Sequence, residues 1–181
     1  LAGEHVGLHF GDHFSLFMDH VFDCLIKTYT PVVELAEKYK LPIGIENMNK
    51  IHEEAEIAYL GVTVEELARV LNAIPSKYFG LTLDIAHASL LPGGPESFID
   101  AFPNRIISTH VCDNDLILDR HVPVGNGKID FKRVFVNLLK VDFKGTLNIE
   151  LPRSNEDRAL SKRRLEPILA ELGILKEALT P

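Results

Sequence analysis

The sequence of 181 residues has little cysteine, no tryptophan and no long apolar segment. With only Cys24 and Cys112 present, a disulfide framework is not expected, and a reducing compartment is. No apolar run approaches the roughly 20 residues that span a bilayer, and no basic stretch followed by an apolar segment opens the sequence. We therefore expect a cytoplasmic protein that has no membrane partner.

Positive charge is also scarce, because 19 basic residues face 26 acidic ones and the formal net charge is −7. This balance gives no global electrostatic reason to expect nucleic acid as a partner. The composition, 46% hydrophobic and 25% charged, is typical of a folded globular protein. The length suits one domain, residues 1–181, with a sizeable core.

Residues 79–87 read Phe-Gly-Leu-Thr-Leu-Asp-Ile-Ala-His, so that large apolar residues alternate with small or polar ones up to Asp84. This alternation predicts a strand with one apolar face and one polar face. Asp84 closes the polar face, and His87 follows three residues later, where the chain leaves the sheet. The spacing allows both side chains to reach one cation.

Similar alternation predicts strands at 5–10, 42–47, 105–111 and 145–151. On the polar face, each of these strands ends in or near a side chain that can bind a metal. These side chains are His9, Glu46, His110 and Glu150.

Helical spacing of apolar residues separates the strands. It predicts a helix over 15–29 that restarts at Thr30-Pro31, and a helix after the capping box of Thr63 and Glu66. A short helix is expected around 98–102, another after the cap Asp130, and a last one from about Asn155. The segment 49–60 is ambiguous.

Alternating strands and helices predict a parallel sheet with helices outside it. A doubly wound sheet needs two apolar faces, whereas each strand here has one, so we expect a TIM-type (β/α)8 barrel. Reactive groups of such barrels collect at the carboxyl ends of the strands, where all five candidate side chains fall.

Two glutamates, an aspartate and a histidine converging in one barrel mouth would repel one another as bare charges, and a divalent cation removes that cost. Mixed oxygen and imidazole ligands suit Mn, Zn, Co or Mg without selecting among them. The sequence therefore predicts a divalent metal ion of unresolved identity.

The ordered set of motifs resembles the xylose isomerase-like TIM-barrel superfamily, which contains sugar and sugar-phosphate isomerases and epimerases and also endonuclease IV. The similarity extends over nearly the whole chain. The motifs are Ile-Glu-Asn (45–47), Leu-Asp-Ile-Ala-His (83–87), Thr-His-Val-Cys-Asp-Asn (109–114), Asp-Arg-His-Val-Pro-Val-Gly-Asn-Gly-Lys-Ile-Asp-Phe (119–131) and Ile-Glu-Leu (149–151).

The resemblance to the isomerase branch implies proton transfer next to a carbonyl through a metal-stabilised enediolate, with Glu46 and Glu150 as the catalytic pair. The partner is then a sugar or sugar phosphate. The implied metal ligands are Glu46, Asp84, His110 and Glu150, and the implied substrate-binding residues are His9, His87, Arg120 and His121.

The resemblance to endonuclease IV implies instead a zinc-dependent hydrolase of abasic DNA, in which further residues complete a cluster of three zinc ions. These additional ligands are His9, His87, Asp119 and His121. Two departures weigh against that branch: Asp84-Ile-Ala-His87 replaces its Asp-Thr-Cys-His, and the loop after His110 differs. A third reading is a metal-binding fragment without catalytic activity.

By the same resemblance, the strand that ends in His9 is the third of the barrel. The first two strand–helix units are then missing and about six remain. An open barrel exposes two sheet edges, so we expect either a piece of a longer protein or a homo-oligomer whose subunits cover the gap.

Overall fold

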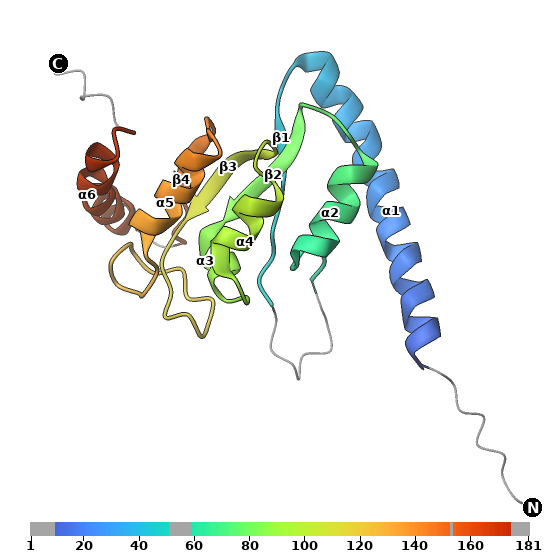
Figure 1. Cartoon of the computed structure of the whole chain (residues 1–181), viewed down its shortest axis with the longest axis horizontal. Helices are drawn as coiled ribbons and strands as arrows, with labels where there is room; N and C mark the ends of the chain where they lie inside the picture. Colours follow the sequence, from blue (N-terminus) through green and yellow to red (C-terminus); the bar gives the residue numbers. More distant parts are fainter. Residues whose placement is uncertain (1–9, 51–58, 153, 175–181) are drawn as a thin grey trace, which may run out of the picture.

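Four parallel strands form one sheet in the computed structural model, which describes residues 10–50, 59–152 and 154–174 (Figure 1). The strands lie in the order β1-β2-β3-β4, and all three neighbouring pairs are parallel. The elements are α1 (Phe10–Tyr39), β1 (Ile43–Glu46), α2 (Val64–Ala73), β2 (Phe79–Asp84), α3 (Ile85–Ser89), α4 (Gly94–Ala101), β3 (Ile106–Val111), α5 (Phe131–Lys140), β4 (Thr146–Ile149) and α6 (Asn155–Glu171).

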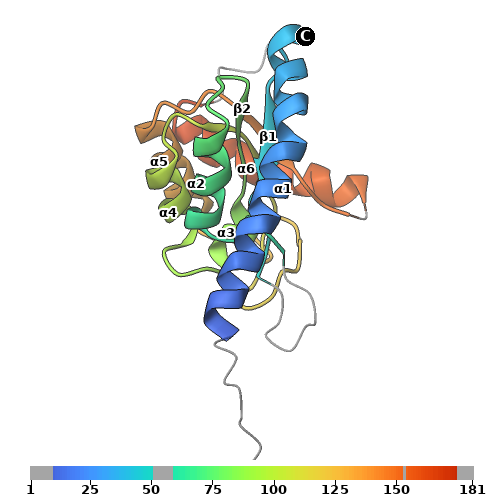
Figure 2. The same ribbon diagram turned by 90° about the vertical axis from the view of Figure 1, so that its right-hand side faces the viewer.

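The core lies between the apolar side of the sheet and the helices that cover it, as the two views show (Figures 1 and 2). Side chains of β2 at positions 79, 81 and 83 are at most 1% exposed, and they join Leu67 of α2 and Phe98 of α4 in one buried cluster. Burial of such side chains is the main favourable term in folding. The expected parallel α/β fold, an incomplete barrel, is confirmed.

The described part of the chain contains four strand–helix units, fewer than the six expected for the whole chain. The strand predicted at 5–10 lies almost entirely outside the described residues, as does the candidate ligand His9; Phe10 already belongs to α1. Among the described helices, none is both long and apolar enough to cross a membrane.

Pairing between the strands aligns their carboxyl ends. Asp84 of β2 pairs with His110 of β3, which in turn pairs with Asn148 of β4. The register shifts between Leu81 and Thr82, whose partners are Ile106 and Ser108, so β3 contains one extra residue. Polar residues of neighbouring strands therefore share one face, where the Thr82 and Ser108 hydroxyls are 3.0 Å apart.

Helix α1 continues through Pro31, which corrects the predicted restart at Thr30. The Thr30 hydroxyl donates to the Ile26 carbonyl at 2.8 Å, so Thr30 is an interior helix residue and not a cap. Phe22 before the proline and Val33 after it are both at most 4% exposed. Their shared packing against the core offsets the hydrogen bond that the proline removes.

The predicted starts of α2, α5 and α6 are confirmed by their caps, whereas α4 begins at Gly94, before the expected 98–102, and has no side-chain cap. Thr63 and Glu66 form a reciprocal capping box at α2, and Asp130 accepts from the Arg133 backbone N–H at α5. At α6, which begins at Asn155, the Ser154 side chain accepts from the Asp157 N–H. Each cap satisfies an N–H that the helix itself leaves without a partner.

Gly80 offers a test of the close approach between β2 and β3. A Cβ at Gly80 lies 2.2 Å from the Arg105 carbonyl oxygen, a backbone atom that cannot turn away. We predict that Gly80→Ala lowers the free energy of unfolding by about 2–3 kcal/mol in urea titration of the intact protein. Gly44→Ala is the control, since its nearest obstacle is the Thr82 hydroxyl, which can rotate. An equal loss in both variants would contradict this account.

Candidate metal centre

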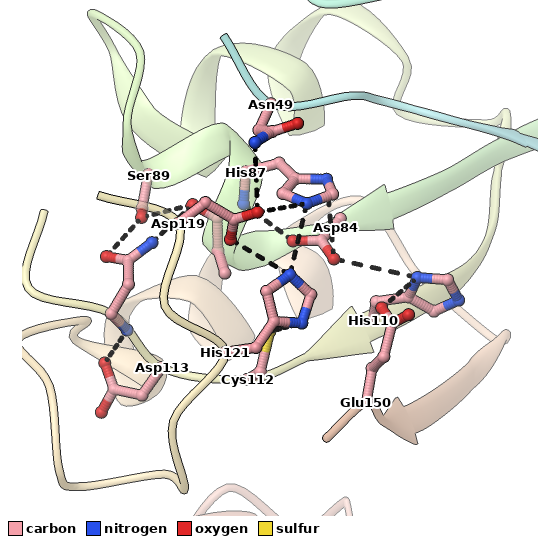
Figure 3. Close-up of polar contacts among 12 residues, drawn as sticks. Asn49, Asp84, His87, Ser89, His110, Cys112, Asp113, Asp119, His121 and Glu150 are labelled. Carbon is pink, nitrogen blue, oxygen red and sulfur yellow. Dashed lines mark hydrogen bonds and ion pairs between the residues drawn. The ribbon is translucent and has the colours of Figure 1, made fainter. Parts of the chain in front are cut away.

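Four side chains predicted as metal ligands converge at the carboxyl edge of the sheet. Glu46, Asp84, His110 and Glu150 each place one ligand atom within 4.8 Å of those of the other three. Glu46 and Asp84 end β1 and β2, His110 lies near the end of β3, and Glu150 directly follows β4. Figure 3 shows Asp84, His110 and Glu150 directed toward one another.

His110 lies between the carboxylates of this group. Its Nδ1 is 3.1 Å from Glu46 Oε1, in a hydrogen bond, and 2.8 Å from Glu150 Oε2, in an ion-pair contact that lacks hydrogen-bond geometry. The hydrogen bond with Glu46 is the main cause that raises the pKa of His110. Burial raises the pKa of Glu46, but the hydrogen bond and charge of His110 outweigh it, and the net pKa is lowered.

Asp84 is the fully buried member, with 0% exposure. Its Oδ1 accepts the His87 backbone N–H at 2.7 Å and so caps α3, whereas its Oδ2 accepts no hydrogen bond from any described residue. Burial raises the pKa of Asp84 to about 6. A buried carboxylate oxygen without a partner is costly, and a divalent cation would satisfy it. The donor set of three carboxylates and one imidazole fits such an ion.

Asn47, also 0% exposed, holds the start of this group in place. Its side chain accepts the Asp84 N–H at 2.7 Å and donates to the Asp84 carbonyl at 3.0 Å. Its own carbonyl lies 2.9 Å from His87 Nδ1. No role was predicted for Asn47, although its position directly after Glu46, at the end of a strand, is a signal that could have identified it.

A second group, His87, Asp119 and His121, lies beside the first (Figure 3). His87 Nε2 is 3.4 Å from Asp119 Oδ2 and 3.4 Å from His121 Nε2, which is itself 3.1 Å from Asp119 Oδ1. Burial lowers the pKa of His87, but the hydrogen bond to Asp119 and the charge of Asp84 outweigh it and raise this pKa to about 9. These three side chains could also hold a cation.

Cys112 lies under the second group. It is fully buried, and its Sγ is 3.4 Å from His121 Nδ1. Burial raises the pKa of this thiol, and nearby carboxylates raise it further, so the sulfur stays protonated at neutral pH. This contact was not predicted, because sequence spacing alone does not show that the loop brings His121 back against Cys112.

The loop between β3 and α5 is wound around the carboxylate of Asp113, which is 1% exposed. Four backbone N–H groups donate to it at 2.8–3.0 Å, two to each oxygen; they belong to Asn114, Gly125, Gly127 and Ile129. A Cβ at Gly127 would lie 2.3 Å from Asp113 Oδ1, so only glycine permits this approach. The backbones of Asp113 and Val122 exchange two hydrogen bonds at 2.9 Å. The loop that carries Asp119 and His121 is therefore held in a defined conformation by buried hydrogen bonds.

Asn114 ties the same loop to α3. Its side chain donates to the Ala86 carbonyl at 2.8 Å and accepts from the Ser89 hydroxyl at 3.2 Å. Because α3 carries His87, this contact brings the two halves of the second group together. The loop and α3 thus position the second group together.

A cavity of about 770 Å³ opens beside both groups. Its lining includes His110 and Glu150 of the first group, Asp119 and His121 of the second, and two arginines, Arg120 and Arg158. Arg120, which the resemblance implies as a substrate-binding residue, lines this cavity. Arg158 was not predicted, because its position in the first turn of a helix carries no motif.

The fold and this ligand-rich mouth define the class: part of a parallel α/β barrel with its reactive groups at the carboxyl ends of the strands. A family model described as xylose isomerase-like TIM barrel matches residues 1–178. The chain belongs to this family, and the predicted resemblance is confirmed.

Three similar proteins illustrate the match. The uncharacterized protein MJ1311 of Methanocaldococcus jannaschii is 33% identical over 158 residues, which are 86% of this chain and 52% of that protein. A crystal structure of a D-tagatose 3-epimerase-like protein is 32% identical, with a TM-score of 0.77 over 88% of this chain and 58% of its own. D-allulose 3-epimerase from Methylomonas sp., in complex with D-allulose, is 17% identical, with a TM-score of 0.63 over 80% of this chain and 53% of its own.

The chain spans about half the length of each of these proteins. The likeness to the D-allulose 3-epimerase, at 17% identity, shows the fold alone. The likeness to the D-tagatose 3-epimerase-like protein combines a shared fold with substantial identity.

Asp113 provides a test of how the loop is held. We predict that Asp113→Asn lowers the free energy of unfolding by about 2–4 kcal/mol, because its amide leaves buried N–H groups without an acceptor. It should also speed hydrogen exchange at the Gly125 and Gly127 amides. Asp115→Asn is the matched control in the same loop, where the carboxylate is more exposed, and a smaller loss is expected. Equal losses in urea titration would show that the buried carboxylate has no special role.

Proposed function

We propose that the intact protein is a divalent-metal-dependent sugar or sugar-phosphate isomerase or epimerase that transfers protons next to a carbonyl. The observation that carries this proposal is the placement of Glu46 and Glu150. They come from the two outer strands of the described sheet and approach His110 within 3.1 and 2.8 Å. Because they reach the site from opposite margins of the sheet, the two carboxylates would suit exchange of protons on two faces of a substrate.

The residues that would hold the cation are Glu46, Asp84, His110 and Glu150, whose ligand atoms lie close enough to share one ion. The unpartnered, buried Oδ2 of Asp84 supports this assignment. When bound, the ion, which could be Mn, Zn, Co or Mg, would act as a Lewis acid and stabilise negative charge on substrate oxygens.

The two glutamates would perform the proton transfers. One carboxylate takes the proton from the carbon next to the carbonyl, and the C–H electron pair forms a carbon–carbon double bond while the carbonyl electrons move to oxygen. Return of a proton from the other glutamic acid to the opposite face gives the epimer. Return of the proton to the former carbonyl carbon gives the isomer when the hydroxyl proton of the neighbouring carbon also moves to the former carbonyl oxygen, so that the carbonyl group forms at the neighbouring carbon.

Substrate contacts would come from side chains near the cavity. His121 and Arg120 line it, and His87 lies 3.4 Å behind His121. The D-tagatose 3-epimerase-like structure, at 32% identity, and the D-allulose complex of a more distant relative support a sugar as the bound molecule.

The second group favours one alternative, phosphodiester hydrolysis at abasic sites in DNA with several zinc ions. His87, Asp119 and His121 meet as the endonuclease resemblance implies, and their ligand atoms lie within 4.8 Å of one another. This alternative requires about three metals per chain and nicking of an abasic duplex. One metal per chain and no nicking would eliminate it.

The metal centre can be tested with Asp84→Asn, which keeps the shape of the side chain and the Oδ1 cap of α3. We predict one tightly bound divalent cation per intact protein chain by calorimetry and elemental analysis, and at least about a 100-fold weaker affinity in the variant, since it removes a direct ligand. Asp100→Asn, exposed on α4, should bind as the wild type does. Unchanged affinity in Asp84→Asn would refute the assignment.

The two-base assignment can be tested with Glu150→Gln and Glu46→Gln in deuterated water. Each variant retains one carboxylate, so each should still exchange substrate hydrogen on one face, while epimerisation falls by about 100- to 10,000-fold. Exchange and epimerisation are followed by NMR at full cation occupancy, confirmed by elemental analysis. Full epimerase activity in Glu150→Gln would rule out its role as a base.

A further inference from the structure

The structure points to a substrate that carries an anionic substituent, a phosphate ester or a carboxylate, and we propose that Arg120 and Arg158 bind this group in the cavity. The inference rests on the proposed sugar isomerase or epimerase function and specifies its substrate class. Both arginines line the same 770 Å³ cavity as His110 and Glu150.

Arg120 is oriented by its own loop. Its Nε donates to Asp115 Oδ2, and the other oxygen of Asp115 accepts the backbone N–H groups of Ile117 and Leu118 at 3.0 and 2.9 Å. The ion pair occupies one edge of the guanidinium, which has five N–H donors in a fixed plane. Arg120 therefore enters the cavity lining with its orientation set and with donors remaining.

Arg158 is oriented by a different part of the chain. It lies in the first turn of α6, where it donates to the Leu151 carbonyl at 2.6 Å and to Asn155 Oδ1 at 3.1 Å. These contacts use two of its five N–H donors. Leu151 directly follows Glu150, so the Arg158 guanidinium is anchored to the segment that leaves β4.

Two guanidinium groups oriented by hydrogen bonds are not needed to bind a neutral sugar. Hydroxyl groups can be bound by amides such as that of Asn148, which also lines the cavity. A planar guanidinium matches the paired oxygens of phosphate and carboxylate, and these charge-assisted hydrogen bonds are the strong ones. Preset orientation lowers the entropy lost on binding.

The charge of the cavity supports the same conclusion. Asp119 and Glu150 contribute negative charge to its lining and by themselves would repel an anion. Arg120 follows Asp119 directly in sequence, and Arg158 donates to the carbonyl of Leu151, the residue after Glu150, so each acid of the lining has an arginine nearby. With a cation on the first group, the cavity becomes favourable for an anionic sugar.

The test compares three matched substrates on the intact, cation-loaded protein: a neutral ketose, its phosphate ester and the corresponding sugar acid. Exchange of the hydrogen next to the carbonyl is measured in deuterated water. We expect kcat/KM at least about tenfold higher for one of the anionic substrates than for the neutral ketose. Which anion is preferred separates the phosphate from the carboxylate.

Arg120→Met and Arg158→Met should each raise KM for the preferred anion about tenfold with kcat nearly unchanged, and should raise KM for the neutral ketose by a much smaller factor. Arg158→Lys keeps the charge and should recover part of the loss. Arg163→Met, exposed on the same helix and outside the cavity lining, is the control. If Arg158→Met fails to fold, Arg120→Met carries the same test.

Binding of inorganic phosphate, measured by calorimetry, distinguishes this inference from the proposed function. Loss of phosphate binding in both methionine variants, with no exchange of any sugar, would support the anion site and refute the isomerase. Equal turnover of neutral and anionic sugars, or unchanged KM and phosphate affinity in both methionine variants, would overturn the anion site.

Discussion

A buried carboxylate at the end of the second strand is the constraint that shapes the site. Asp84 uses its backbone to pair with Asn47, one oxygen to start α3, and leaves the other oxygen facing His87 and His110 at 3.7 and 3.8 Å. Such a carboxylate is tolerated only where opposite charge surrounds it. His87 and His110 supply part of that positive charge. In the proposed function, a divalent cation supplies the rest, and the chemistry of the site depends on this ion.

The four described strands and the convergence of the first group of side chains could be predicted from the sequence because both depend on local periodicity. Alternation at 79–84 fixes which side chains share a face, and parallel pairing then brings Asp84, His110 and Glu150 to one edge. Helix starts were equally local, since Thr63 or Asp130 caps its own helix. The family, expected from the ordered motifs, is confirmed by the family model that matches residues 1–178.

The rest depends on contacts between distant residues, which periodicity does not encode. Asp113 gathers N–H groups up to sixteen residues away, and Asn114 reaches back to Ala86 across 28 residues. Continuation of α1 through Pro31 depends on packing of its two halves against one core, which outweighs the local signal of Thr30. Arg158 became visible only when the cavity showed which residues line it.

Glu46 and Glu150 belong to opposite margins of the described sheet, at β1 and just after β4. The width of the space between them is therefore a property of the whole sheet and not of any bond near the site. Twist accumulates across the three strand pairings, including the one at the Thr82–Ser108 contact and the extra residue of β3. Substitutions in the middle of the sheet would thus change the distance between the Glu46 and Glu150 carboxylates without contacting either one.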